Sequence, residues 1–159
     1  MTKNIRPMKA AHKKAVMNIL QATSEFKPIE VITAEELIDY YLTEGTLSGY
    51  HVLIAKVGTE INGYICFGPI PLTDGTWDVY WMAVSPEKKG QGIGSALLAM
   101  AEGKIHELNG RLILIETSST AEYELTRRFY HHAGYNIICR IPDFYAVGDG
   151  LVVFQKRLV

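Results

Sequence analysis

The chain has 159 residues, of which 48% are hydrophobic and 21% are charged. This length predicts a single domain over residues 1–159, and the apolar content excludes a disordered or fibrous protein, because such chains bury too little apolar surface to offset the entropy lost on ordering. Sixteen Lys and Arg residues stand against 17 Asp and Glu residues, which gives a formal net charge of −1. Since binding to a phosphate backbone needs an excess of positive charge, we expect no nucleic-acid partner.

The cysteines and the apolar segments of the sequence indicate in which cellular compartment we expect the protein. The two cysteines, Cys66 and Cys139, lie among apolar neighbours, where a free thiol packs as a small hydrophobic group, and two are too few for a structural zinc site. No segment approaches the roughly 20 apolar residues that span a bilayer, and the first residues lack the apolar run of a signal peptide. We therefore expect a cytoplasmic protein with reduced thiols, no metal and no membrane association.

Hydrophobic periodicity predicts an α/β fold in which helices cover both faces of one mixed sheet. The second helix is expected to begin at Thr33, whose spacing to Glu36 is typical of a capping box. In chain order the expected elements are a short strand near Ile5, helices at 10–22 and from Thr33, strands at 51–57, 61–67 and 77–84, a helix at 93–108, a strand at 111–116, a helix at 121–133, and strands at 135–140 and 151–156.

A glycine-rich loop joins the strand ending at Val84 to the next helix, and it consists of Lys89, Gly90, Gln91, Gly92, Ile93, Gly94 and Ser95. Alternating glycines allow backbone N–H groups to converge at a helix N-terminus, where they favour a phosphate or pyrophosphate. The loop lacks the third glycine of a dinucleotide fingerprint and the Gly-Lys-Ser/Thr of a Walker loop. The alternative is a flexible strand-to-helix turn without a ligand.

Two motifs resemble those of the GNAT acyltransferase superfamily. Lys89, Gly92 and Gly94 take the three positions of its CoA-binding motif, although Gln or Arg is usual at the first. Further on, the segment 128–135 is similar to the Phe/Leu-Tyr-x-x-x-Gly-Phe/Tyr pattern that closes the following helix of the family. The likeness runs from about His51 to the C-terminus, and details of it resemble a small, uncharacterised subgroup.

This resemblance implies both a fold and an activity. The fold is a mixed, mostly antiparallel central sheet of six or seven strands flanked by about four helices on both faces. The activity is transfer of an acetyl group from acetyl-CoA to a primary amine by direct attack, without a metal. The resemblance further implies that residues 89–95 hold the pyrophosphate and that the pantetheine arm lies along Met82, Ala83 and Val84.

Three side chains are candidates for proton transfer. Tyr130 matches the family's tyrosine near the sulfur, which donates a proton to the leaving thiolate; the alternative is an aromatic residue of the core. Glu116 matches the base of some relatives, and Asp78 on the preceding strand is its rival. The simpler interpretation of each residue is a solvated carboxylate at the end of a strand, without a catalytic role. Many relatives carry Asn seven residues before the tyrosine, where this chain has Tyr123.

The amine acceptor is left open between a small molecule and a peptide or protein. Acidic and aromatic residues at two places in the sequence could present a binding surface to a cationic amine. The alternative is that these residues lie in solvated loops without a ligand. They are Glu25, Glu30, Asp39, Asp143, Phe144, Tyr145 and Asp149. The alternative function is a catalytically silent CoA-binding sensor or interaction domain. Arg127 and Arg128 are interpreted as solvated charges or as contacts to a CoA phosphate, and an exposed edge at 151–154 predicts a possible homodimer.

Overall fold

The computed structural model describes residues 2–158, in which seven strands form one mixed sheet in the order β1-β2-β3-β4-β5-β7-β6. The strands are β1 (Lys3–Pro7), β2 (His51–Val57), β3 (Glu60–Pro69), β4 (Thr76–Val84), β5 (Leu112–Ser118), β6 (Asn136–Ala146) and β7 (Asp149–Arg157). The helices are α1 (Lys13–Ala22), α2 (Pro28–Glu44), α3 (Ile93–Glu107) and α4 (Glu124–His132). Neighbouring strands are antiparallel except β4 and β5, which are parallel.

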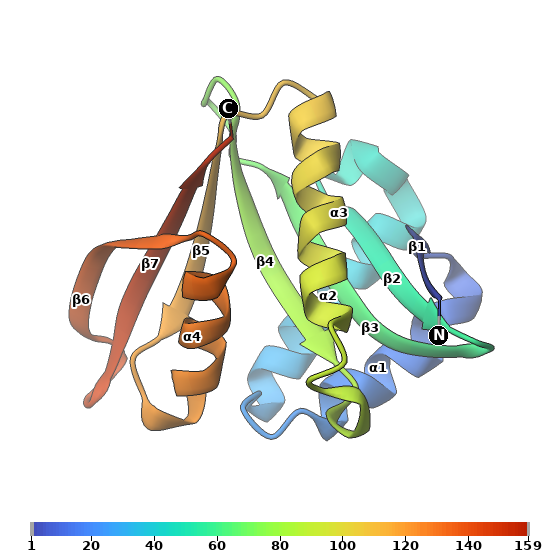
Figure 1. Cartoon of the computed structure of the whole chain (residues 1–159), viewed down its shortest axis with the longest axis horizontal. Coiled ribbons are helices and arrows are strands. Elements are labelled where there is room, and N and C mark those ends of the chain that lie inside the picture. The colour runs from blue at the N-terminus through green and yellow to red at the C-terminus, as the bar shows by residue number, and fades with distance from the viewer. Residues whose placement is uncertain (1, 159) are drawn as a thin grey trace.

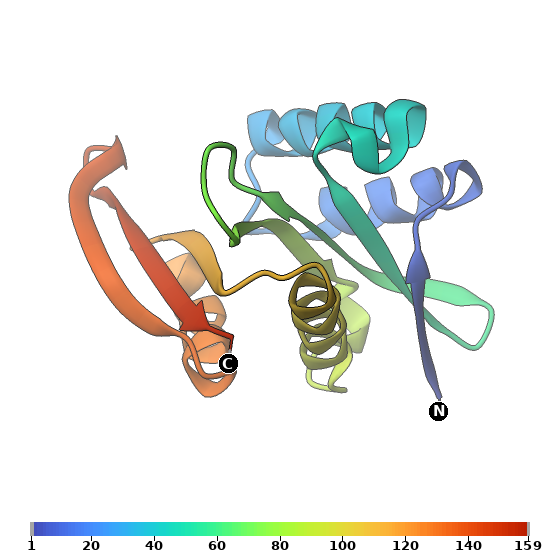
Figure 2. The ribbon, with the colours of Figure 1, turned by 90° about the horizontal axis from the view of Figure 1, so that it is seen from above.

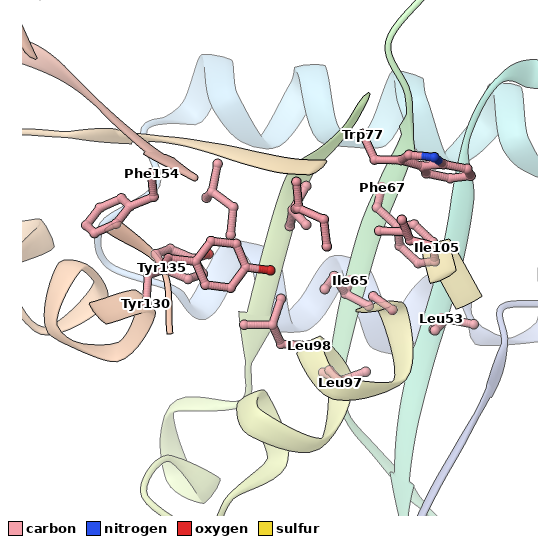
Figure 3. Packing of buried hydrophobic residues seen from close by; sticks show 14 of the residues in the cluster. Leu53, Ile65, Phe67, Trp77, Leu97, Leu98, Ile105, Tyr130, Tyr135 and Phe154 are labelled. Atoms are coloured by element: carbon pink, nitrogen blue, oxygen red, sulfur yellow. The ribbon is translucent and has the colours of Figure 1, made fainter. Parts of the chain in front are cut away.

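The helices lie on both faces of the sheet, as expected: α1 and α2 cover one face, and α3 and α4 cover the other (Figures 1 and 2). Each face has its own core. On the side of α3 and α4, Tyr130, Tyr135 and Phe154 pack together at one end and Phe67 and Trp77 at the other (Figure 3). On the opposite side, the buried residues include Val16, Leu20, Ile38, Ile54 and Tyr64.

The central strands are apolar on both faces because both faces are covered by helices. Five of the seven residues of β2 are apolar, and only His51 and Lys56 are not fully buried. Gly63 of β3 has a packing reason, since a Cβ at that position would lie 2.9 Å from Leu97 Cδ1 and 3.1 Å from Ile93 Cγ2 of α3. The missing side chain therefore allows α3 to lie close against the sheet.

The expected start of the second helix was wrong, because α2 begins at Pro28 rather than at Thr33. Proline is favoured at the first helical position, where its missing N–H needs no partner. The Thr33 hydroxyl donates to the Ile29 carbonyl at 2.9 Å, a bond inside the helix. The Thr33 to Glu36 spacing was thus misread as a cap.

The two C-terminal strands also differ from expectation. β6 continues to Ala146 instead of ending near Arg140, with an irregular register between Ile141 and Ala146. β7 lies between β5 and β6, so the segment 151–154 is not an exposed edge. The edge strand at this end of the sheet is β6, all of whose residues are exposed. Cys139 on β6 is therefore exposed rather than packed as a core residue, whereas Cys66 is buried as expected.

The sheet splits between β4 and β5. These strands pair only where Thr76–Val79 lie beside Leu112–Ile115, although β4 continues to Val84 and β5 to Ser118. Tyr80 is an extra residue of β4 relative to β3, because Phe67 pairs with Val79 and Cys66 with Trp81. Beyond this bulge the two strands diverge, as Figure 1 shows. The split opens the sheet between its two helix layers.

Candidate active site

The glycine-rich loop lies at the far end of β4 and leads directly into α3. Gly90 and Gly92 have φ angles of +80° and +77°, in the left-handed region that favours glycine. The Ala96 amide donates to the Gly92 carbonyl at 3.1 Å, and the amides of Ile93, Gly94 and Ser95 precede this first helical bond and have no intrahelical acceptor. Loop and helix end together present free N–H donors to an anion.

Lysine side chains add positive charge beside this loop. Lys3 of β1 comes close, since a Cβ at Gly92 would lie 3.0 Å from Lys3 Nζ. Lys89 Nζ lies 3.5 Å from Glu25 Oε1, in the connection between α1 and α2. Sequence reasoning missed Lys3, because no local pattern connects a residue at the chain start with a loop some 90 residues later.

Met82, Ala83 and Val84 lie on the part of β4 that has β3 on one side and no strand on the other. Met82 and Val84 pack against the core under α3, and Ala83 is buried on the side of α1 and α2. The backbone edge that faces the split is therefore free of strand pairing. An extended ligand can add to such an edge through main-chain hydrogen bonds.

Tyr130 of α4 is buried on the side of α3 and α4, with 5% of its surface exposed. Its ring lies 5.8 Å from the Phe154 ring and 6.0 Å from the Tyr135 ring, centroid to centroid. Within residues 2–158, no side chain or backbone group forms a hydrogen bond with its hydroxyl. Burial raises the pKa of this hydroxyl. The ring is thus a core contact, while the hydroxyl stays protonated and available to a ligand.

Asp78 and Glu116 lie on the opposite face of the sheet, toward α1 and α2. Their strand neighbours Val79 and Ile115 point into the core under α3 and α4, and side chains alternate along a strand. Burial, with a smaller contribution from Glu116, raises the pKa of the Asp78 carboxyl from 3.8 to about 6. Asp78 is half-buried, whereas Glu116 is exposed.

A groove of about 310 Å³ runs between α3 and α4 and begins beside the glycine loop. Its lining is formed by Ser95, Leu98, Ala99, Glu102, Phe129, His132 and Ala133. At its far end Glu102 accepts hydrogen bonds from Tyr135 Oη and Lys156 Nζ, both at 2.9 Å. This cluster fixes the end of α4, and hence Tyr130, relative to α3.

Two arginines near Tyr130 have structural partners. Arg127 Nη1 donates to the carbonyls of Ser118 and Thr120, each at 2.8 Å, so it holds the connection between β5 and α4. Arg128 forms an ion pair with Glu124 at 2.9 Å on the exposed side of α4. In the described part of the chain, no group of three His, Cys, Asp or Glu side chains is placed to hold a metal ion. The helices of residues 2–158 include none with the length and apolar character needed to cross a membrane.

Tyr123 links the start of α4 to the connection between α1 and α2. Its hydroxyl lies 3.2 Å from the Glu25 carbonyl and 3.4 Å from Glu30 Oε2, and donates to these acceptors. Phe26 of the same connection packs edge-on against Trp81 of β4. The connection is therefore attached on both sides of the split. Sequence reasoning noted Tyr123 only as a departure from the family's Asn.

Comparisons with known proteins show the family to which the chain belongs. The family model for the acetyltransferase (GNAT) domain matches residues 48–137. A solved structure from Desulfovibrio desulfuricans, described as a putative acetyltransferase of the GNAT family, is 34% identical in sequence and superposes with a TM-score of 0.95. The match covers 99% of this chain and 100% of that one. An uncharacterised N-acetyltransferase of Methanocaldococcus jannaschii is 30% identical over 105 residues, which are 65% of this chain and 64% of that protein.

More distant structures share the fold. The structure of yncA from Salmonella typhimurium with acetyl-CoA is 20% identical, with a TM-score of 0.80, over 100% of this chain and 95% of that one. The family model and the Desulfovibrio desulfuricans structure together show that the chain belongs to the GNAT family of N-acetyltransferases.

Proposed function

We propose that the protein transfers an acetyl group from acetyl-CoA to a primary amine by direct attack of the amine on the thioester. One observation carries this proposal: the sheet splits between β4 and β5, with the glycine loop beyond the end of β4, a tyrosine hydroxyl without a partner on the side of α3 and α4, and two carboxylates on the other side. The reaction needs each of these groups. A donor that enters from the side of α3 and α4 would meet the loop and the tyrosine, and an acceptor that enters from the opposite side would meet the carboxylates.

The donor half of the site consists of the loop and the open edge of β4. We expect the amides of Ile93, Gly94 and Ser95 to bind the pyrophosphate, with Lys3 and Lys89 adding positive charge. Gly90 and Gln91 shape the loop through which the backbone approaches the phosphates. The backbone of Met82–Val84 can pair with the amides of the pantetheine arm, which places the thioester in the split.

The acceptor half must remove a proton from the substrate ammonium before attack. Asp78, with a pKa of about 6, is deprotonated near neutral pH yet holds a proton better than an ordinary aspartate, which suits a general base. Glu116 is the alternative base and can act through a water molecule. Attack forms the C–N bond, and collapse of the tetrahedral species breaks the C–S bond and releases the thiolate.

Tyr130 acts on the leaving group, which is the thiolate of CoA. Its raised pKa keeps the hydroxyl protonated, so that it can donate a hydrogen bond to the developing thiolate. Complete proton transfer is unfavourable, because a thiol resembling cysteine titrates at about 8.5, well below this buried phenol. We therefore assign to Tyr130 hydrogen-bond stabilisation of the developing thiolate during bond breaking; the hydroxyl keeps its proton, and the released thiolate takes its proton from solvent.

The direct test is release of free CoA thiol from acetyl-CoA in the presence of a panel of primary amines. Acceptor-dependent thiol release supports the proposal. If CoA raises the melting temperature but no amine of the panel causes thiol release, the protein is instead the catalytically silent CoA-binding domain. A bound ligand at 100 times its Kd stabilises a protein by about 2.7 kcal/mol, so binding is readily seen.

We also expect a homodimer, and β6 replaces β7 as the strand that would form it. Ile137, Ile138, Ile141 and Phe144 are 40–52% exposed on this edge strand, which has free backbone groups on one side. A two-fold axis would pair β6 with its copy. Light scattering should give twice the 17.8 kDa mass of one chain, and Ile138→Lys should return it to that mass. A single-chain mass for the unaltered protein at micromolar concentration would exclude the dimer.

A further inference from the structure

A row of three tyrosine rings lies on the face of the sheet that carries Asp78. The Tyr50 ring lies 5.5 Å from the Tyr80 ring and 6.4 Å from the Tyr40 ring, centroid to centroid, and each pair is packed edge to face. Tyr80 belongs to β4, Tyr50 precedes β2, and Tyr40 lies near the end of α2. Ring contacts therefore join three elements into one aromatic row.

The bulge of β4 places the start of this row beside Asp78. Side chains normally alternate along a strand, but the extra residue brings both Tyr80 and Trp81 to the side of α1 and α2. Gly68 of β3 pairs with Asp78, and a Cβ at Gly68 would lie 3.3 Å from Tyr80 Cε2. The Tyr80 ring thus lies over β3, next to the candidate base.

The row is open to solvent. Tyr80 is 37% exposed and Tyr40 is 52% exposed, while Tyr50 is half-buried between them. Within residues 2–158, the tyrosine hydroxyls that form hydrogen bonds are those of Tyr41, Tyr123 and Tyr135. The hydroxyls of the row are thus free for a ligand. Exposed tyrosines are typical of surfaces that bind proteins and peptides, because a rigid ring gives a large contact area at a low entropic cost.

The row leads away from the donor. β2 and β4 both run antiparallel to β3, so the start of β2 lies at the end of the sheet opposite to the glycine loop that follows β4 (Figure 1). Toward the loop, the next side chain on this face of β4 is Trp81, against which Phe26 packs edge-on. A chain that continues from an amine at Asp78 therefore has its open direction over the tyrosine rings.

We propose that the tyrosine row binds the first residues of a peptide acceptor, and that the reacting amine is the α-amine of a peptide or protein N-terminus. This inference rests on the proposed N-acetyltransferase function and names its substrate class. The ring-to-ring steps of 5.5 and 6.4 Å span about three residues of an extended peptide, at roughly 3.3 Å each. Because the chain leads away in one direction, a terminus fits the row better than a lysine within a polypeptide.

The test measures thiol release from acetyl-CoA with alaninamide and with alanine peptide amides of two to five residues. For the unaltered enzyme, kcat/KM should rise by about tenfold or more up to about the fourth residue, mainly through KM, and then level off. The reason is that each added residue covers more of the row and no ring lies beyond Tyr40 to bind the fifth.

Tyr40 stands at the far end of the row, and its exposure makes it a safe position to change. Tyr40→Ala should raise the KM for the four-residue amide about three- to tenfold and leave alaninamide unaffected. Tyr40→Phe keeps the ring and should retain most of the gain with length. Ile32→Ala, two turns earlier on the exposed side of the same helix, is the matched control and should behave like the unaltered enzyme.

Equal kcat/KM for all lengths, or an equal effect of Tyr40→Ala on alaninamide and on the four-residue amide, would overturn this inference and leave the acetyltransferase function intact. Faster acetylation of a lysine in an N-terminally blocked peptide, or of small amines but no peptide, would also overturn it. Absence of thiol release with every acceptor, despite binding of acetyl-CoA, would instead contradict the proposed function itself.

Discussion

Replacement of Asp78 by Asn should stabilise the protein at neutral and alkaline pH. The pKa of Asp78 is raised from 3.8 to about 6, so the folded protein binds this proton more tightly than the unfolded chain does. The stability that comes from this proton is fully present below about pH 3.8 and is lost as the pH rises through about 6. Above that pH the charged carboxylate destabilises the fold, and the neutral amide of Asn removes this effect.

The magnitude follows from the pKa difference and from exposure. A difference between 3.8 and about 6 corresponds to about 3 kcal/mol for a fully buried group. Because Asp78 is only half-buried, solvent screening reduces this to about 1 kcal/mol, or a rise in melting temperature of about 2–4 °C for a chain of this size. Glu116→Gln removes the nearby charge alone and should stabilise less.

Urea unfolding of Asp78→Asn and of the unaltered protein at about pH 4 and about pH 8 measures the effect. The stability difference should be near zero at the lower pH and about 1 kcal/mol in favour of the variant at the higher pH. If Asp78 is the general base, the same variant should lose about 100-fold or more in kcat, and kcat/KM of the unaltered enzyme should rise with pH through about 6. A variant that is less stable at about pH 8, or equally affected at both pH values, would refute the assignment of a desolvated carboxylate.

The remaining predictions concern the donor loop and its support. Gly92→Val should abolish the rise in melting temperature caused by CoA, because the position has a positive φ and a side chain there would contact Lys3 Nζ; Gly103→Ala, in open space on α3, is the control that should keep the shift and gain about 0.5–1 kcal/mol in unfolding free energy. Lys156→Met should lower the unfolding free energy by about 1–3 kcal/mol in urea titrations, since it removes hydrogen bonds to Glu102 and to the Ala133 carbonyl and leaves a partly buried carboxylate with one partner; an unchanged midpoint would contradict the role given to this cluster.

Local features of the chain were predictable from its sequence. The apolar runs of β2 and β3, the glycine loop and the helix that follows it depend on residues close together in sequence, and the structure places them as expected. The family motifs correctly indicated the fold. Even so, a local signal misled at Thr33, because a Thr-x-x-Glu spacing also occurs inside helices, where the hydroxyl bonds to the preceding turn.

Features that depend on distant residues could not be predicted. The position of β7 inside the sheet is set by its pairing with β5, so a buried central strand and an exposed edge strand looked alike in sequence. Likewise, the bond between Tyr123 and Glu30 joins residues 93 positions apart, and Lys3 reaches the loop across the sheet. Contacts between residues so far apart leave no local pattern in the sequence.

Thiol release from acetyl-CoA by the unaltered enzyme and by Tyr130→Phe, measured side by side with a saturating amine, tests the central claim most directly. Because the Tyr130 hydroxyl has no partner in the described chain and its ring supplies the packing, the variant should fold with unchanged stability and bind CoA with nearly unchanged Kd. Its kcat should fall by about 100-fold or more, and less when the leaving thiol is made more acidic. Full activity of Tyr130→Phe would contradict the claim that this hydroxyl stabilises the leaving sulfur in the split between β4 and β5.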